Sequence, residues 1–281
     1  MSQPAFEGMP QRLYPAAPSR LTTYLDCPRR YRLGYLERPA PSRGAPWAHH
    51  SVGAAVHTAL ARWWDLPRDR RTPAGGGDLL SACWLTAGFR DDAQQAAVRD
   101  RTRSQVERYL AGVDSDVRPV GIERTVGVTT RHAYLWGRVD RVDDRAGEGL
   151  VVVDYKTGRS VPTVEDARTS LALAVYAAGT ARELRRPCTR VELHHLPTGR
   201  VVAWDHTDAS LAAHLDRADR AAAALGELDE RHAAGMSPAE ADEAFPARVE
   251  PRCAWCEVRS ACPPGRAVPQ RAPWAGVVDP P

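Results

Sequence analysis

The stretch from residue 137 to residue 158 decides the fold: Gly137-Arg138-Val139-Asp140-Arg141-Val142, followed after eight residues by Val151-Val152-Val153-Asp154-Tyr155-Lys156-Thr157-Gly158. Its apolar, β-branched runs predict strands over residues 132–143 and 150–155, and the polar segment 144–149 predicts the turn between them. Because side chains alternate faces along a strand, Asp154 and Lys156 point the same way. If the two strands pair across this turn, Asp140 approaches Asp154, and two carboxylates and an ammonium surround one small volume.

This constellation is typical of a site for phosphate chemistry. Two carboxylates, waters and a substrate phosphate are the usual environment of Mg²⁺, which polarises the phosphate and lowers the pKa of a bound water. Lys156 is suited to orient or deprotonate that water, and it is the only lysine among 38 basic residues. Arginine is always protonated, whereas the pKa of lysine falls readily on burial. The alternative is a surface ion pair at the end of a strand.

Outside this stretch the pattern alternates between helices and strands. Helices are expected over 19–37, 51–64, 165–184 and 208–234, and two more within 79–110, with residues 67–77 as a loop. Further strands are expected over 118–129, 189–196 and 200–205. Strands flanked by helices indicate an α/β core.

Composition limits the function classes. The 281 residues carry a net charge of +3, and residues 1–145 hold 22 Arg against 16 acidic residues. Such an Arg-rich half is suited to phosphates, although a solvated charged surface explains it equally well. No apolar run is long enough to span a membrane and no signal-peptide core is visible, so we expect a cytoplasmic protein without a membrane partner. A P-loop is excluded because the only lysine lies in another context.

Six cysteines in a reducing compartment indicate metal ligation or buried thiols before disulfides. Cys253, Cys256 and Cys262 form a C-x₂-C-x₅-C run near the end of the chain, and Cys27 near its start is the candidate fourth ligand. Four thiolates suit an iron–sulfur cluster or a structural zinc ion, and spacing does not separate the two.

The motifs Gly-Arg-Val-Asp-Arg and Asp-Tyr-Lys-Thr-Gly resemble the nuclease domain of the RecB, AddB and Cas4 group of PD-(D/E)XK nucleases. The resemblance implies a restriction-endonuclease-like core, in which helices flank a mixed β-sheet and both chain ends meet at a four-cysteine site. It implies that His57, Asp140, Asp154 and the backbone carbonyl of Tyr155 hold Mg²⁺ or Mn²⁺, and that Lys156 is catalytic together with Asp140 and Asp154.

The same resemblance implies further roles. Glu123 matches an accessory acidic position, and Tyr176 matches a tyrosine that the group places four residues after a glutamine. Here Ala172 stands in place of that glutamine, which puts one substrate contact in doubt. The split cysteine spacing resembles that of members with a [4Fe–4S] cluster, bound here by Cys27, Cys253, Cys256 and Cys262, with Zn²⁺ as the alternative.

We therefore expect four parts: a flexible arm (1–18), a nuclease core (19–245), a cysteine segment (246–266) and a disordered Pro-rich tail (267–281). The function expected from the resemblance is that of a Mg²⁺- or Mn²⁺-dependent exonuclease on single-stranded DNA ends in repair or recombination, working with a separate helicase or repair protein. The alternatives are a catalytically weak DNA-end-binding module of a larger complex and a structural zinc protein.

Overall fold

A six-stranded mixed sheet forms the centre of the computed structural model, which describes residues 13–277. The strands are β1 (Tyr14–Ala16), β2 (Gly121–Thr129), β3 (Ala133–Arg145), β4 (Gly149–Lys156), β5 (Arg190–His195) and β6 (Arg200–Asp205). They lie in the order β1-β3-β4-β5-β6, and β2 pairs with β3. The expected α/β fold with a mixed sheet between helices is confirmed.

Strand β3 organises the sheet because it has three partners. Its first residues pair in parallel with β1, and its last five pair antiparallel with residues 149–153 of β4, across the expected turn. Strand β2 pairs antiparallel with β3 over most of its length. Residues 136–140 of β3 have neither β1 nor β4 as a ladder partner, so the sheet opens on this edge, where Asp140 lies.

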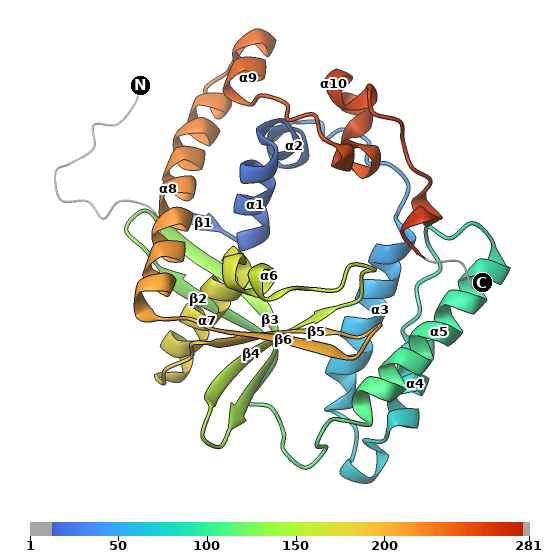
Figure 1. Ribbon diagram of the computed structural model, residues 1–281. Helices are drawn as coiled ribbons and strands as arrows, with labels where there is room; N and C mark the ends of the chain where they lie inside the picture. Colours follow the sequence, from blue (N-terminus) through green and yellow to red (C-terminus); the bar gives the residue numbers. More distant parts are fainter. Residues whose placement is uncertain (1–12, 278–281) are drawn as a thin grey trace.

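Two layers of helices cover the sheet (Figure 1). One layer holds α3 (Ala48–Trp63), α4 (Pro73–Ala82) and α5 (Asp92–Leu110), and the other holds α1 (Pro18–Asp26), α6 (Val164–Thr169), α7 (Leu171–Leu184) and α8 (Asp208–Ala233). Strand β4 is buried between the layers: Val151 and Val153 pack with α3, while Leu150 and Val152 pack with α7. Full burial of each such side chain stabilises the fold by roughly 1.5–3 kcal/mol.

The start of the chain meets the C-terminal segment at one end of the molecule (Figure 1). There α2 (Pro28–Tyr31) and a π-helical turn (Arg32–Leu36) lie beside α9 (Pro238–Ala244), α10 (Pro263–Arg266) and three short 3₁₀ helices, Pro251–Trp255, Arg259–Ala261 and Pro273–Gly276. Arg30 pairs with Glu257 at 3.0 Å, and the Arg29 Nε donates to the Phe245 carbonyl at 3.0 Å. The two distant segments are therefore held together by direct contacts.

Several expected boundaries are wrong. The segment 67–77 is not entirely a loop, because Thr72 caps α4, which begins within it. The glycines of α4 allow this helix to pack closely on α5, since a Cβ on Gly76 would collide with Leu110. The helix expected over 165–184 is divided at Ser170, whose extended backbone ends α6 and whose hydroxyl caps α7. The helix expected over 19–37 is interrupted at Cys27, because Pro28 begins a new helix.

The chain ends also differ from expectation. Residues 14–16, expected in a flexible arm, form β1, and Pro273–Gly276, expected in a disordered tail, forms a 3₁₀ helix followed by Val277, which packs on the α3 core. Residues 1–12 of the expected arm and 278–281 of the expected tail lie outside the described residues. Among residues 13–277, no helix combines the length and apolar character that a bilayer crossing requires.

Candidate metal centre and active site

The alternation of side chains breaks in both β2 and β3 at the same level of the sheet. Val126 and Val139 pack with α7, whereas Ile122 packs with the α3 core on the opposite face. The ladder pairs Ile122 with Arg141 and Arg124 with Val139, with no pair between them. At this break Glu123 has a φ of 47°, a left-handed conformation that is uncommon for residues other than glycine. The distortion is consistent with Glu123 and Asp140 facing α3.

The break brings three ligand-type side chains together. His57 of α3 lies with its Nδ1 3.1 Å from Asp140 Oδ1, and the other carboxylate oxygen of Asp140 accepts a hydrogen bond from the Tyr155 backbone N–H at 2.8 Å. His57, Glu123 and Asp140 each offer one ligand atom within 4.8 Å of the others. The Asp140 side chain thus replaces a missing ladder contact between β3 and β4 and faces His57 at the same time.

Asp154 and Lys156 form the other half of the site. The Lys156 Nζ lies 2.6 Å from Asp154 Oδ2, and this buried oxygen has no other donor among the described residues. Burial raises the pKa of Asp154, the Lys156 ammonium opposes this shift, and the negative charge of Asp140 adds to it. The two carboxylates are therefore close enough to interact, as the pairing of β3 with β4 predicts.

The charges of the site favour a cation. Burial lowers the pKa of His57, but the hydrogen bond and the charge of Asp140 outweigh it, so the net pKa is raised. Burial raises the pKa of Glu123 against the opposing effect of Arg138, whose Nε lies 2.7 Å from the Glu123 carboxylate. Carboxylates that repel one another beside an imidazole are a ligand set that suits Mg²⁺ or Mn²⁺.

An open cavity of about 500 Å³ gives access to this site. It lies between α3 and the β2–β3 hairpin, and His57, Glu123, Arg138 and Arg62 are among its lining residues. Sequence reasoning did not select Arg138, although its position two residues before Asp140 on one strand was a usable signal.

Tyr176 of α7 approaches the site from the other face of the sheet. Its ring lies against Gly137, where a Cβ would come within 2.5 Å of the ring. Burial, followed by the charges of Asp154 and Asp140, raises the pKa of Tyr176 to about 12. The glycine of the Gly-Arg-Val-Asp motif therefore makes room for a tyrosine beside the carboxylates. Ala172 lies one helical turn before Tyr176 and is also only partly buried.

The four cysteines singled out in the sequence line one small cavity. Cys27 lies at the junction of α1 and α2, and Cys253, Cys256 and Cys262 lie on the C-terminal segment. All four are free thiols. No three of their sulfur atoms, within the described part of the chain, lie within 4.8 Å of one another. Cys188, outside this set, is a buried thiol whose pKa burial raises to about 12.

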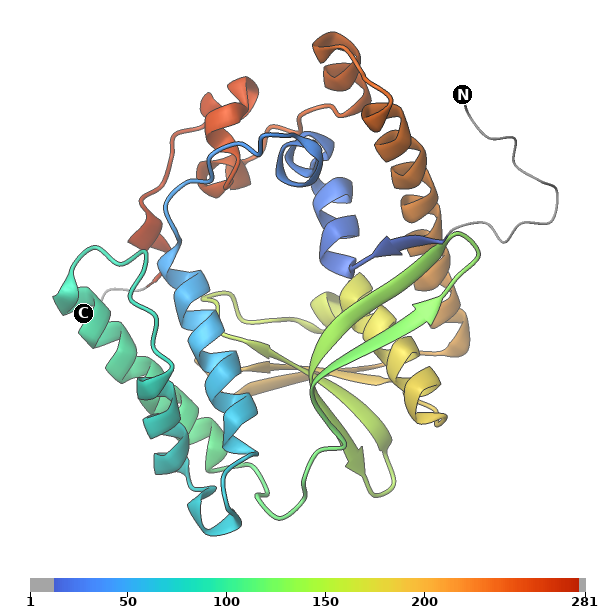
Figure 2. The same ribbon diagram turned by 180° about the vertical axis from the view of Figure 1, so that it is seen from behind.

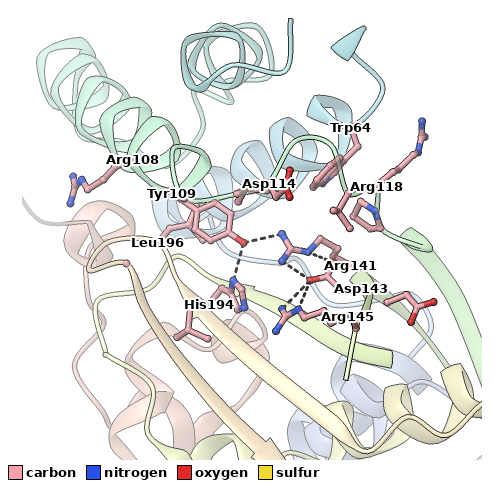
Figure 3. A pocket seen from close by; sticks show the side chains of 18 residues that line it. Trp64, Arg108, Tyr109, Asp114, Arg118, Arg141, Asp143, Arg145, His194 and Leu196 are labelled. Atoms are coloured by element: carbon pink, nitrogen blue, oxygen red, sulfur yellow. Dashed lines mark hydrogen bonds and ion pairs between the residues drawn. The ribbon is translucent and has the colours of Figure 1, made fainter. Parts of the chain in front are cut away.

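A larger cavity of about 730 Å³ lies between the ends of α3 and α5 and the β3–β4 hairpin (Figure 3). Its polar groups satisfy one another: Arg141 donates to Asp143 at 2.9 Å and to the Tyr109 hydroxyl at 3.1 Å, and Tyr109 meets His194 at 2.8 Å. Arg141 also donates to the Tyr155 hydroxyl at 3.3 Å. This network anchors the strand positions next to Asp140 and Asp154 but does not include the carboxylates of the site.

We expect Arg141→Met to lower the free energy of unfolding by about 2 kcal/mol, because the buried Tyr109 and Tyr155 hydroxyls lose a donor and Asp143 keeps only Arg145 as a cationic partner. Urea unfolding measures this as a lower midpoint with an unchanged m-value. The matched control is Arg186→Met, whose partner Asp144 is the neighbour of Asp143 in sequence and whose ion pair is exposed. The control should leave the midpoint unchanged. Equal effects in the two variants would contradict a stabilising role for the buried network.

A family profile described as the PD-(D/E)XK nuclease superfamily matches residues 15–263. None of the curated proteins matches the chain. Among solved structures, the one titled "Crystal structure of SSO0001" is similar over 91% of this chain and 88% of its own, with 12% sequence identity and a TM-score of 0.39. A similarity this distant indicates neither a substrate nor a mechanism.

Proposed function

The chain belongs to the PD-(D/E)XK nuclease superfamily, and from this premise we propose that it is a Mg²⁺- or Mn²⁺-dependent deoxyribonuclease that degrades single-stranded DNA ends in repair or recombination. The observation that carries the proposal is the meeting of His57, Glu123 and Asp140 within 4.8 Å, beside the Asp154–Lys156 pair. These residues come from an interrupted hairpin, a neighbouring strand and a helix, and His57 and Glu123 among them line one open cavity.

The roles proposed for the individual residues follow from their contacts. His57, Asp140 and Asp154 would hold the divalent ion with the Tyr155 carbonyl, as the family resemblance implies, and the position of Glu123 supports its inclusion as a ligand or as a base for a water. When bound, the ion would polarise the scissile phosphate and lower the pKa of a water. Asp154 Oδ2 is buried and has only the Lys156 ammonium as a partner among the described residues, so it has acceptor capacity left for a cation, which supports this assignment.

Lys156 would act on the substrate side. Its ammonium is held by Asp154 and is 46% exposed, so it can reach a phosphate that enters from solvent. There it would orient or deprotonate the attacking water and offset charge that develops on the phosphoryl oxygens. The new P–O bond forms to the water oxygen while the bond to the leaving oxygen of the DNA backbone breaks.

Metal binding by the purified protein tests the first step. We expect Asp140→Asn to weaken Mn²⁺ binding at least about 100-fold, because the loss of a ligand should exceed the 10- to 100-fold typical of outer partners. Paramagnetic resonance of free Mn²⁺ measures this independently of activity. The amide oxygen can still accept from the Tyr155 N–H, so the strand contact is preserved.

The matched control is Asp144→Asn, four residues along the same strand and exposed, which should bind Mn²⁺ as the parent does. In the parent, cleavage of end-labelled single-stranded DNA should appear with Mg²⁺ or Mn²⁺ and disappear with EDTA. Cleavage that persists in EDTA would overturn the proposed metal dependence.

We also propose that Cys27, Cys253, Cys256 and Cys262 bind a [4Fe–4S] cluster. All four thiols line one small cavity, and four thiolates suit such a cluster. The resemblance of the split cysteine spacing to that of cluster-binding members of the group supports a cluster over a single zinc ion.

A second candidate function is a catalytically weak DNA-end-binding module, and the observation that favours it is Ala172 in place of the glutamine of the group. It predicts salt-sensitive DNA binding without cleavage at any metal concentration. Turnover by the parent protein, absent from Lys156→Ala prepared in parallel, would exclude it. In the leading proposal, unwinding would come from a separate helicase or repair protein.

A further inference from the structure

One row of side chains on β3 leads from the open end of the hairpin to the metal centre. Tyr134, Trp136, Arg138 and Asp140 occupy alternate positions of the strand and therefore share a face. Tyr134 is 40% exposed and Trp136 is 42% exposed, which is uncommon for such large rings. Arg138 follows them and lines the cavity that opens onto His57 and Glu123.

No helix layer covers this face of the hairpin. The helices that pack on this half of β3 are α1, α7 and α8, and they meet the opposite face through Leu135, Gly137 and Val139. In Figure 2 the β2–β3 hairpin, drawn in green, extends away from α3 with its near face free of helices. The row is therefore open to a partner along its length.

Packing within the protein explains the position of the Tyr134 ring only in part, and it explains the position of the Trp136 ring even less. The Tyr134 ring lies over Gly127, where a Cβ would come within 2.5 Å of its hydroxyl. Trp136 is directly opposite the same Gly127 in the ladder, so its direct partner across the hairpin has no side chain and the Tyr134 ring covers that position. Its indole makes no hydrogen bond or ring contact with any residue of the described range 13–277. With Tyr134 it forms a contiguous pair of exposed rings, and contiguous exposed apolar surface is typical of a binding site.

The exposed ring faces select the kind of ligand. A base can stack on such a ring only when its own face is free, which a single strand permits and an intact duplex, whose bases stack on one another, resists. Aromatic stacking platforms of this kind bind single strands with little sequence preference.

Positive charges on both sides of the two rings also suit a nucleic-acid ligand. Arg138 is 68% exposed at its side chain and lies between the rings and the carboxylates, where its pair with Glu123 leaves outward N–H groups available. Arg131, in the turn between β2 and β3, is exposed at the other end. Guanidinium groups bind phosphates in a fork geometry. A cation that fits a nucleic-acid backbone thus lies on each side of the two rings.

We propose that Trp136 and Tyr134 form a stacking platform for the single-stranded DNA segment next to the scissile phosphate, with Arg138 binding the backbone between platform and metal centre. The inference rests on the proposed nuclease function and adds the residues that would bind the single strand. The strand would run along β3, and the two stacked bases would set the position of the phosphate that reaches Asp140.

The test measures the affinity of the full-length protein for fluorescein-labelled (dT)₂₀ and for a 20-base-pair duplex, with Mg²⁺ present and Lys156→Ala as the parent background to prevent cleavage. We expect Trp136→Leu and Tyr134→Leu each to weaken (dT)₂₀ binding about ten-fold, because each removes one stacked base. Leucine keeps an apolar side chain at the position but lacks a π-face. Trp136→Phe should stay within about three-fold of the parent.

Two further readouts separate stacking from other roles. The slope of log Kd against log salt concentration should be unchanged in the leucine variants, since no phosphate contact is lost. Trp274→Leu is the matched control, because Trp274 is similarly exposed at 37% but lies on the C-terminal 3₁₀ helix, and it should bind (dT)₂₀ as the parent does. Circular dichroism of each variant checks the fold, and because the two rings are replaced separately, one folded leucine variant suffices for the test.

The outcomes that overturn the inference are distinct from those that overturn the function. Parent-like (dT)₂₀ binding by both leucine variants, or an equal loss for (dT)₂₀ and duplex, would refute the platform while leaving cleavage by the wild type intact. A shift in oligomeric mass without a change in DNA affinity would mark the row as a protein interface instead. Absence of both cleavage and (dT)₂₀ binding in the wild type would refute platform and function together.

Discussion

Replacement of Lys156 by alanine should reduce the rate of DNA cleavage by about 10²- to 10³-fold, the loss typical when one charged or hydrogen-bonding group that stabilises a transition state is removed. The reason lies in its position: the ammonium is held 2.6 Å from Asp154 Oδ2 at the opening of the site. The measurement is single-turnover cleavage of end-labelled single-stranded DNA at saturating Mg²⁺. Single-turnover conditions isolate the chemical step from product release.

The fold should survive this substitution, because the Lys156 side chain is 46% exposed. Arg159→Ala is the matched control, since it removes an exposed cation three residues further along the chain and away from Asp154; it should change the rate by no more than a few-fold. Lys156→Arg distinguishes the two roles. Arginine keeps the charge but does not give up a proton, so rescue would indicate charge stabilisation and failure would favour proton transfer. Unchanged activity of Lys156→Ala would end the catalytic assignment.

The sequence predicted the centre of the site because its geometry follows from local rules. A short turn fixes the pairing of the two strands, and the alternation of side chains then brings Asp140 near Asp154 and Lys156. His57 is different, since its approach to Asp140 depends on how α3 packs on the sheet. That contact was expected only from the family resemblance.

Glu123 shows where sequence reasoning stops. Its inclusion with His57 and Asp140 depends on a left-handed backbone at φ 47° and on a missing rung of the ladder. Glutamate has no local preference for this conformation, so tertiary contacts must impose it. The same limit explains α4: the run Gly75–Gly77 signals a loop locally, and only the close approach of α5 makes its small residues favourable in a helix.

The cysteines show a second limit. Their spacing in the chain indicates one site, and the structure describes all four around one cavity, yet sequence spacing carries no information on the distances between sulfurs. Those distances depend on α2 and the C-terminal segment, which are joined by ion pairs such as Arg30–Glu257 as well as by any metal. A bound cluster would thus reinforce an existing contact between the two ends of the described chain.

Cys27→Ser should therefore abolish the cluster and destabilise the protein, because metal-binding free energy at such a site is folding free energy. We expect an anaerobically purified wild type to be brown, with about four irons per chain, as four cysteines require for a [4Fe–4S] cluster. The variant should be colourless and melt at a lower temperature. The measurements are visible absorbance, iron and zinc analysis, and thermal unfolding monitored by circular dichroism.

The control is Cys83→Ser, which changes a free thiol outside the four-cysteine cavity and should keep colour, iron content and melting temperature. If the ion pairs between α2 and the C-terminal segment suffice to keep the ends together, Cys27→Ser should destabilise the protein only in part. Arg30→Ala in the Cys27→Ser background should then lower the melting temperature further. A colourless wild type with one zinc per chain would replace the cluster by a structural zinc site. Loss of colour without any change in melting temperature would show that the cysteines bind a metal but do not join the two ends.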